Sequence, residues 1–339
     1  MSPPLVVIDA DVLGRERTGD ETYVENLLRQ LPLVAGGELA FAAVTRRPDL
    51  VPAGVQALEL PARVQELRMA LALPRLLRRL RPAVAHFQHA LPLRCPCPAV
   101  VTVHDLSFER EPAAMGLKDR LIFKAVVPRA ARRAERVVAV SERTKRDLVE
   151  LYGVSDARIV VTPNGVDPAF GPEGPATEGA YVLFVGAIQE RKNPLAAADA
   201  AAEVGLPLVV AGPERDAGLA RELARRGAGL RGYVEKPELA ELYRGAACLI
   251  LPSRFEGFGL PVLEAMACGT PVVACPDPAM QEVAGDAAIF AEPAGLGDAA
   301  RRAIADRERM RAAGLARARL FSWDETARRT LAVYRELIG

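Results

Sequence analysis

Residues 253–271 constrain the fold more than any other segment, because with their flanks they predict a strand, a glycine-rich loop, a short helix and a second strand. The apolar run 248–251 is typical of a buried parallel strand. Gly257 and Gly259 then let the backbone approach a ligand closely. Pro261 suits the first turn of a helix, where its missing N–H costs nothing. Strands that alternate with helices in this way predict a doubly wound parallel sheet.

The loop in this segment predicts a ligand with two kinds of polar group. It places main-chain amides at a helix N-terminus beyond the carboxyl end of a strand, where open parallel sheets bind ligands and where phosphate is favoured. Two carboxylates flank it, Glu256 in the loop and Glu264 in the expected first helical turn. A carboxylate repels phosphate but accepts hydrogen bonds from hydroxyls, so a ligand with phosphates and sugar hydroxyls would use both features. Alternatively, the two acids only stabilise the positive end of the helix dipole.

The same segment carries a family resemblance. Its runs Glu-Gly-Phe-Gly-Leu-Pro and Glu-Ala-Met-Ala-Cys-Gly-Thr-Pro resemble the Glu-x7-Glu signature of retaining glycosyltransferases of family 4, which have the GT-B fold of two Rossmann-like domains facing a cleft. The resemblance implies that Glu264 binds the nucleotide ribose. It further implies that Glu256 and the backbone amides that follow it hold the donor sugar and the diphosphate. Those amides belong to Gly257, Phe258, Gly259 and Leu260.

The composition restricts the partners and the compartment. Lys plus Arg number 44 against 43 Asp plus Glu, so no global charge points to nucleic acid. The sequence shows neither an N-terminal signal pattern nor an apolar run long enough to span a bilayer. Five cysteines, an odd number, indicate reduced thiols. We therefore expect a cytoplasmic protein, and its 339 residues are enough for two domains.

The first strand, expected at 5–8, leads into two candidate features. Asp9-Ala10-Asp11 imitates the Asp-x-Asp metal motif of the other glycosyltransferase fold. Acids commonly cap loops at strand ends, however, and the GT-B enzymes that this chain resembles need no divalent cation, so no metal is expected. The polar loop 17–22 is expected to precede a helix at 23–31, and the resemblance makes its Gly19 a candidate for approaching the donor phosphates. The missing Gly-x-Gly-x-x-Gly argues against a nicotinamide dehydrogenase.

Residues 64–80 predict a helix interrupted by Pro74, with arginines among its leucines. One interpretation is a solvated basic face on a core helix. The other is a peripheral contact with an anionic membrane that carries a lipid-linked acceptor. The arginines of this segment and its flanks are Arg63, Arg68, Arg75, Arg78, Arg79 and Arg81.

The histidines suggest two different sites. His86 and His89, followed by Cys95 and Cys97, suggest zinc, but His86 lies within an expected strand at 84–87, so no zinc site is predicted. His104 follows the expected strand 99–103, and Thr-Val-His-Asp-Leu-Ser-Phe resembles the family motif whose His contacts the donor sugar beside the reaction centre. His104 and Glu256 are therefore the catalytic candidates. Asp105 is expected to orient His104 or its loop.

The second half repeats the pattern of the first. A strand expected at 181–186 leads into a loop with Arg191 and Lys192, and cations at a strand end suit a diphosphate; the alternative is solvated surface charge. Arg-Lys-Asn here resembles a family element that implies a phosphate contact for Lys192. Many relatives carry an Arg directly after the glycine of this loop. Here that position is Ala187, and Arg191 is the candidate to replace the missing cation.

The remaining elements give the domain boundaries. Residues 1–167 are expected to form an N-terminal acceptor domain, 168–179 a Pro- and Gly-rich linker, 180–321 a nucleotide-sugar domain, and 322–339 a helix that crosses back to the first domain. Ser322 and Glu325 read as a capping box for that helix. Other strands are expected at 41–45, 55–60, 137–140, 159–161, 208–212, 232–234 and 272–274.

The resemblance, which covers nearly the whole chain, implies a retaining, metal-independent glycosyltransferase. It would move a hexose, mannose from GDP-mannose in the first instance, to a glycan or lipid-linked acceptor. The nucleotide-diphosphate sugar would be a co-substrate, and no cofactor is expected. No carboxylate in these motifs is an obvious covalent nucleophile, and the resemblance implies front-side attack, with the leaving diphosphate taking the acceptor's proton. The alternatives are a sugar-nucleotide epimerase or hydrolase of the same fold, and a non-catalytic nucleotide-sugar-binding protein.

Overall fold

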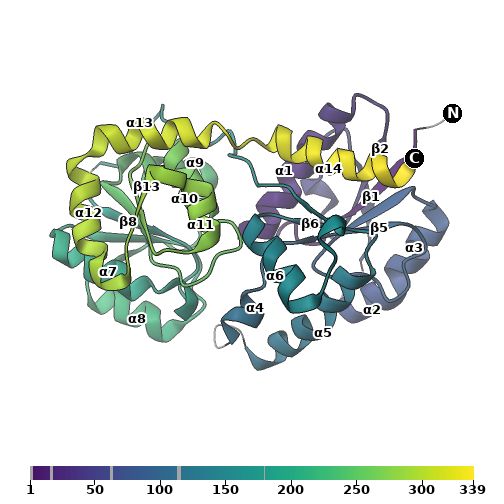
Figure 1. The fold of residues 1–339 in the computed structure, drawn as a ribbon, viewed down its shortest axis with the longest axis horizontal. Coiled ribbons are helices and arrows are strands. Elements are labelled where there is room, and N and C mark those ends of the chain that lie inside the picture. The colour runs from purple at the N-terminus through teal and green to yellow at the C-terminus, as the bar shows by residue number, and fades with distance from the viewer. Residues whose placement is uncertain (1–2, 16–17, 62–63, 113–115, 179) are drawn as a thin grey trace. The chain divides into compact units, whose positions relative to one another are not determined.

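The computed structural model describes residues 3–15, 18–61, 64–112, 116–178 and 180–339 (Figure 1). The chain folds into two compact units. The first is formed mainly by the residues up to Gly165 together with Ser322–Gly339, and the second mainly by Val166–Phe321. The last helix therefore belongs to the unit in which the chain begins.

The first unit is built on a parallel sheet with the strand order β3-β2-β1-β4-β5-β6-β7 among the described residues. The chain runs outward from β1 to β3 and then returns to β4 beside β1, so the strand order reverses between β1 and β4. Ligands of open parallel sheets bind at such a reversal, outside the carboxyl ends of the strands. The strands are β1 (Leu5–Asp9), β2 (Ala40–Thr45), β3 (Gln56–Glu59), β4 (Val84–Gln88), β5 (Ala99–Val103), β6 (Arg136–Ala139) and β7 (Ile159–Val161).

The helices of the first unit pack on this sheet and bury apolar side chains such as Val101, Phe108 and Leu148. Helix α6 shows how local sequence sets the ends: the Ser141 hydroxyl accepts a hydrogen bond from the Thr144 amide, and Gly153 ends the helix in the left-handed conformation. The helices are α1 (Thr18–Ala35), α2 (Gln65–Leu67), the π-helical turn η2 (Arg68–Ala72), α3 (Leu73–Leu80), α4 (Ser107–Arg110), α5 (Leu117–Arg133), α6 (Glu142–Tyr152) and α14 (Trp323–Ile338).

Helix α14 is held to the first unit by buried polar contacts. Ser322 caps the helix by accepting from the Glu325 amide. The chain passes so close to Gly165 that a Cβ there would lie 2.0 Å from the Trp323 nitrogen, so only glycine fits. In the interior, the Tyr334 hydroxyl lies 2.6 Å from His86 Nδ1, and the other nitrogen of that ring lies 2.7 Å from the Thr102 hydroxyl. Figure 1 shows α14 alongside α1.

The second unit has its own parallel sheet, with the strand order β10-β9-β8-β11-β12-β13 among the described residues and a reversal between β8 and β11. Its strands are β8 (Val182–Val185), β9 (Leu208–Ala211), β10 (Gly229–Leu230), β11 (Cys248–Leu251), β12 (Val272–Ala274) and β13 (Ala288–Phe290). Its helices are the 3₁₀ turn η5 (Glu190–Lys192), α7 (Pro194–Val204), α8 (Ala217–Arg225), α9 (Lys236–Gly245), α10 (Leu260–Ala267), α11 (Pro278–Ala284), α12 (Leu296–Ala305) and α13 (Arg307–Ala318). The predicted class, two doubly wound parallel α/β domains, is confirmed.

Several predicted elements need correction. Residues 232–234 are not a strand; β10 pairs with β9 at Gly229–Leu230, and the chain turns at Gly232, which has a φ of 66°. Helix α1 begins at Thr18, so Gly19 lies in its first turn and not in a loop. The segment predicted as one helix at 64–80 is α2, a π turn and α3, with Pro74 near the start of α3. Strand β13 was not predicted.

Candidate active site

The second unit gathers three charged side chains at the reversal of its sheet. Arg191 and Lys192 lie in η5, directly after β8, while Glu256 follows β11. Lys192 Nζ donates to Glu256 Oε1 at 2.5 Å, and Arg191 Nη1 lies 3.8 Å from Oε2 of the same carboxylate. Arg191 also donates to the Phe255 carbonyl. Strands β8 and β11 are neighbours in the sheet, and the loops that follow them therefore bring both cations to one carboxylate.

This charged group is largely shielded from water. The Lys192 and Arg191 side chains are each 12% exposed and Glu256 is 8% exposed. Burial raises the pKa of Glu256, but the attraction of Lys192 and Arg191 outweighs it, so the net pKa is lower than the ordinary value. Glu256 is thus ionised at neutral pH. Two cations against one carboxylate leave an excess positive charge, which suits an anionic ligand.

The N-terminus of α10 adds amide donors beside this group. Gly259 is the N-cap and has a φ of 102°, where side chains are strained, and a Cβ there would lie 3.2 Å from Met280 Cγ. No described residue accepts a hydrogen bond from the amides of Phe258, Gly259 or Leu260. Asp277 connects this loop to α11, because its side chain caps that helix and also accepts a hydrogen bond from the Glu256 amide at 3.4 Å. These amides are available to a phosphate.

Glu264 has a different environment from Glu256. It lies in the second turn of α10, not in the first as predicted. The Tyr243 hydroxyl donates to its Oε2 at 2.9 Å. Burial raises the pKa of Glu264 to about 7, and Asp167 adds to the rise, whereas the Tyr243 hydrogen bond and Lys236 oppose it. A carboxyl group with this pKa can accept hydrogen bonds when ionised and donate one when protonated.

His104 lies in the first unit, directly after β5. Its Nε2 lies 2.9 Å from the Gln88 amide oxygen, which makes Nε2 the protonated nitrogen and leaves Nδ1 as the acceptor. Tyr23 meets the ring edge-on, with 4.9 Å between the ring centroids. Burial lowers the pKa of His104 to about 4, so the ring is neutral at pH 7. Asp105 does not hold this ring; its carboxylate accepts from the Ser107 amide and hydroxyl at the start of α4.

Two family descriptions match the chain in succession. They are Glycosyltransferase Family 4 over residues 17–170 and Glycosyl transferases group 1 over residues 179–306. The chain belongs to the family 4 glycosyltransferases. This confirms the family that the motifs around Glu256 and His104 indicated.

This glycosyltransferase is similar to O-antigen chain mannosyltransferase B of Escherichia coli, with 29% identity over 270 residues and 70% of each chain covered. It is also similar to a D-inositol 3-phosphate glycosyltransferase of Acidothermus cellulolyticus, with 33% identity over 71% of this chain and 62% of the relative. The solved sucrose-phosphate synthase of Thermosynechococcus elongatus matches 99% of both chains with a TM-score of 0.78 at 21% identity, which shows a shared fold.

The other predicted positions of this glycosyltransferase have structural explanations. Arg68, expected on a basic face, is fully buried and its guanidinium binds Asp9 with contacts of 2.6 and 3.0 Å. Asp11 forms ion pairs with Arg15 and Arg46, so both acids of the Asp-x-Asp motif contact arginines. Among the described residues, no atom lies within 4 Å of a Cβ placed on Gly19, so packing against them does not require a glycine there. Arg63 lies outside the described residues.

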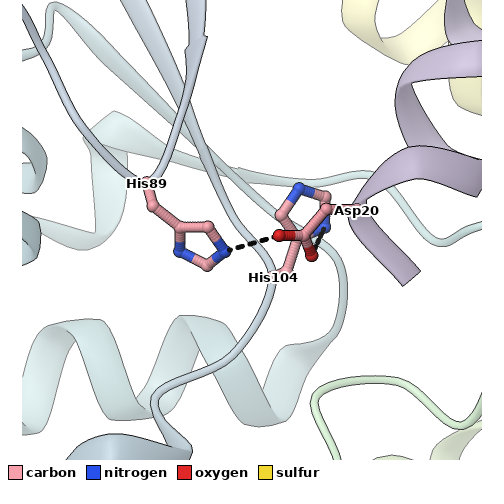
Figure 2. Close-up of side chains that lie close together, drawn as sticks. All are labelled: Asp20, His89 and His104. Atoms are coloured by element: carbon pink, nitrogen blue, oxygen red, sulfur yellow. Dashed lines mark ion pairs between the residues drawn. The ribbon is translucent and has the colours of Figure 1, made fainter. Parts of the chain in front are cut away.

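Sequence reasoning missed two side chains near His104. His89 Nε2 lies 3.6 Å from Asp20 Oδ2, and His104 Nδ1 lies 4.0 Å from Asp20 Oδ1 (Figure 2). The available signal was positional, because His89 and His104 each directly follow a strand and β4 pairs with β5. The suggested zinc set of His86, His89 and the two cysteines is not assembled: His86 is fully buried in β4 against Thr102 and Tyr334.

Proposed function

We propose that this glycosyltransferase moves a hexose, mannose in the first instance, from a nucleotide-diphosphate sugar to a saccharide or lipid-linked acceptor, with retention at the anomeric carbon. The observation that carries the proposal is the buried group of Lys192, Arg191 and Glu256 beside the N-terminus of α10. Mannose is supported by the E. coli relative, which is named as a mannosyltransferase. The inositol-phosphate relative makes other sugars and acceptors part of the test.

In the proposed complex, Lys192, Arg191 and the amides of residues 258–260 bind the diphosphate. Glu264 binds the ribose hydroxyls and Glu256 the donor sugar. His104 is the proposed contact of the reacting sugar. Each assignment follows the chemistry of the group: cations and amides suit phosphate oxygens, and carboxylates suit hydroxyls.

The proposed reaction needs no covalent intermediate. The bond between the anomeric carbon and the diphosphate oxygen breaks, and the acceptor oxygen bonds to the same face of that carbon. The acceptor's proton passes to the departing phosphate oxygen. The protein's part is electrostatic, because Lys192 and Arg191 stabilise the charge that develops on the leaving group. In this scheme their two positive charges do the work of a divalent cation, and no cofactor takes part.

A sugar-nucleotide screen tests the proposal directly. UDP-, GDP- and ADP-sugars are added to the purified protein with a chelator present, and the melting temperature is followed. A donor at about 100 times its Kd stabilises the native state by about 2.7 kcal/mol, which raises Tm by roughly 4 °C if the whole chain unfolds in one transition. We expect GDP-mannose to do so; no response to any sugar nucleotide would overturn the proposal.

Product analysis separates transfer from the same-fold alternatives. With donor and a hexose-terminated acceptor, NMR of the product should show the anomeric configuration of the donor. An epimerase or hydrolase would instead consume the donor without an acceptor and release an isomerised nucleotide sugar or a free sugar. A non-catalytic binding protein would show the shift in Tm without any product.

We also propose that the protein makes a peripheral contact with a membrane, on its cytoplasmic face. Among the described residues, no helix is both long and apolar enough to cross a bilayer. Near α2 the side chains of Val64, Leu67 and Leu71 are 49%, 55% and 46% exposed, and three exposed arginines follow in α3, at 75, 78 and 79. Apolar side chains beside cations suit an anionic lipid surface. Sedimentation with anionic vesicles should exceed that with neutral vesicles, and equal binding to both would contradict the contact.

A further inference from the structure

Three potential metal ligands of the first unit meet at one edge of its sheet. Asp20 lies in the first turn of α1, which follows β1, while His89 and His104 come directly after β4 and β5. Since β1, β4 and β5 are parallel neighbours, their carboxyl ends lie together. The topology thus brings an acid and two imidazoles from three distant segments to one place (Figure 2).

The ligand atoms are close to metal-binding distances. One nitrogen of each histidine and one oxygen of Asp20 all lie within 4.8 Å of one another. His89 Nε2 lies 3.6 Å from one oxygen of Asp20, and His104 Nδ1 lies 4.0 Å from the other. Tetrahedral zinc, with bonds of about 2.1 Å, separates its ligand atoms by about 3.4 Å. Small side-chain rotations would therefore close the three groups around one ion.

The surroundings orient the two rings for coordination. The bond from His104 Nε2 to Gln88 leaves Nδ1 as the nitrogen that faces Asp20, and such a hydrogen bond behind a ligand fixes its tautomer. His89 has a φ of 57°, in the left-handed region that few residues other than Gly adopt, although His does so more often than most. The bond from its amide to the Thr102 carbonyl, 2.9 Å long, holds that conformation. Backbone strain of this kind is concentrated at functional sites.

The chemistry of this donor set selects the metal. Two imidazole nitrogens and one carboxylate favour first-row transition metals such as Zn²⁺ over Mg²⁺ or Ca²⁺, which prefer oxygen ligands. The Asp20 side chain is 31% exposed and His89 is 14% exposed, so an ion and its remaining water ligands can reach the site from solvent. Three protein ligands leave a coordination position open.

We propose that Asp20, His89 and His104 form a binding site for a divalent transition metal of the zinc class, and that the bound metal inhibits glycosyl transfer because it occupies Nδ1 of His104. The second clause rests on the proposed function, in which His104 contacts the donor sugar. The first clause stands by itself, since it concerns binding alone.

Binding is tested on the 339-residue chain, stripped with a chelator and then titrated with ZnCl₂ by calorimetry. The visible spectrum of a Co²⁺-substituted sample gives a second readout of nitrogen and oxygen ligation. We expect one strong equivalent, weakened by about 100-fold or more in His89→Asn and in Asp20→Asn, because even the loss of an outer partner weakens metal sites 10- to 100-fold. Asparagine is chosen at 89 because it tolerates the left-handed backbone.

The matched control is Cys95→Ser with Cys97→Ser, since these thiols lie 3.8 Å apart and are the other group of soft ligands in this unit. Binding that survives in this control and weakens in the two Asn variants supports the site. Binding lost in the control but kept in the Asn variants, or no tight equivalent in the wild type, overturns it. Circular dichroism confirms that each variant is folded.

Inhibition is tested separately, with transfer measured across a Zn²⁺ titration. The wild type should lose activity over the range in which calorimetry shows binding, and excess chelator should restore it. His89→Asn should remain active at Zn²⁺ concentrations that inhibit the wild type. Tight binding without inhibition would overturn the second clause alone. A chain without transferase activity would refute the proposed function, whereas the calorimetric result would still decide the metal site.

Discussion

The contact between Lys192 and Glu256 allows a test in which two substitutions affect nucleotide binding in opposite directions. Lys192 Nζ is 2.5 Å from Glu256 Oε1, so a diphosphate must compete with the carboxylate for this cation. Lys192→Met removes the cation and keeps the aliphatic stem. Glu256→Gln removes the competing charge with little change of shape. The first should weaken the binding of a nucleoside diphosphate, and the second should strengthen it.

The magnitudes follow from burial and from the remaining neighbours. Breaking a buried pair by removing one partner costs about 3–5 kcal/mol. Arg191 still lies 3.8 Å from the other oxygen of Glu256, so we expect Lys192→Met to lose about 3 kcal/mol of unfolding free energy, at the lower end of that range. The same substitution removes a charge-assisted hydrogen bond to the ligand, worth about 1.5–3 kcal/mol, which should weaken the binding of a nucleoside diphosphate by about 10- to 150-fold. The tighter binding in Glu256→Gln should reach up to about tenfold, or about 1.4 kcal/mol.

The pair also has a pH signature. The pKa of Glu256 is below its ordinary 4.5 in the folded chain, so its contribution to stability is present above that value and is lost as the pH falls through the folded pKa. Lys192→Met should raise the pKa of Glu256. The stability difference between wild type and variant should therefore shrink on acidification.

The assays are calorimetry with the nucleoside diphosphate and urea unfolding followed by circular dichroism. The double variant completes a thermodynamic cycle, and we expect a coupling of about 2 kcal/mol in stability, within the range of contacting residues. A coupling near zero, or weaker nucleotide binding in both single variants, would refute the reasoning. Glu256→Gln should nonetheless lose turnover with the full donor, because its charge no longer faces the sugar.

Three further predictions concern other parts of the structure. Glu264→Gln should increase the free energy of unfolding above about pH 7. Because the folded pKa of Glu264 is raised from 4.5 to about 7, the stability that the protonated carboxyl gives the native state is fully present below pH 4.5 and is lost as the pH rises through 7, by at most about 3 kcal/mol. Denaturation of the wild type and the variant should therefore differ at pH 8 and agree at pH 4. Gly259→Ala should cost about 1–3 kcal/mol through its φ of 102° and should also weaken donor binding. Gly205→Ala, also at positive φ but with no described residue within 4 Å of the added Cβ, should lower stability alone. Tyr334→Phe should cost about 1–3 kcal/mol because buried His86 loses a partner, and a Tm unchanged from wild type would contradict that role for α14.

Most of the fold could be predicted because its strands are short apolar runs between strong helix signals. Ser141, Gly153 and Ser322 act as the caps that their local sequence predicts. The failures have local causes too. Strand β10 has only two residues, too few for a pattern. Arg68 looks like surface charge in sequence, and only its buried pairing with Asp9 from a distant strand shows otherwise.

The candidate site could be predicted in part, since the motifs named Glu256, Glu264, Lys192 and His104. What the motifs did not contain is the partner of each group. Lys192 and Glu256 are 64 residues apart, and no periodicity links them. Asp20 and His89 become neighbours of His104 only through the order of β1, β4 and β5 in the sheet. Sequence spacing within one segment does not determine such pairings.

The two carboxylates of the Glu-x7-Glu pattern illustrate the difference. In the sequence they are equivalent acids at a fixed spacing, but the fold shifts their pKa values in opposite directions. Glu256 lies against Lys192 and Arg191, which lower its pKa despite burial. Glu264 lies beside Tyr243 and near Asp167, and burial raises its pKa to about 7. Glu256 therefore carries a negative charge that holds Lys192 in place. Glu264 can change between accepting and donating near neutral pH, which suits a contact with hydroxyls that do both.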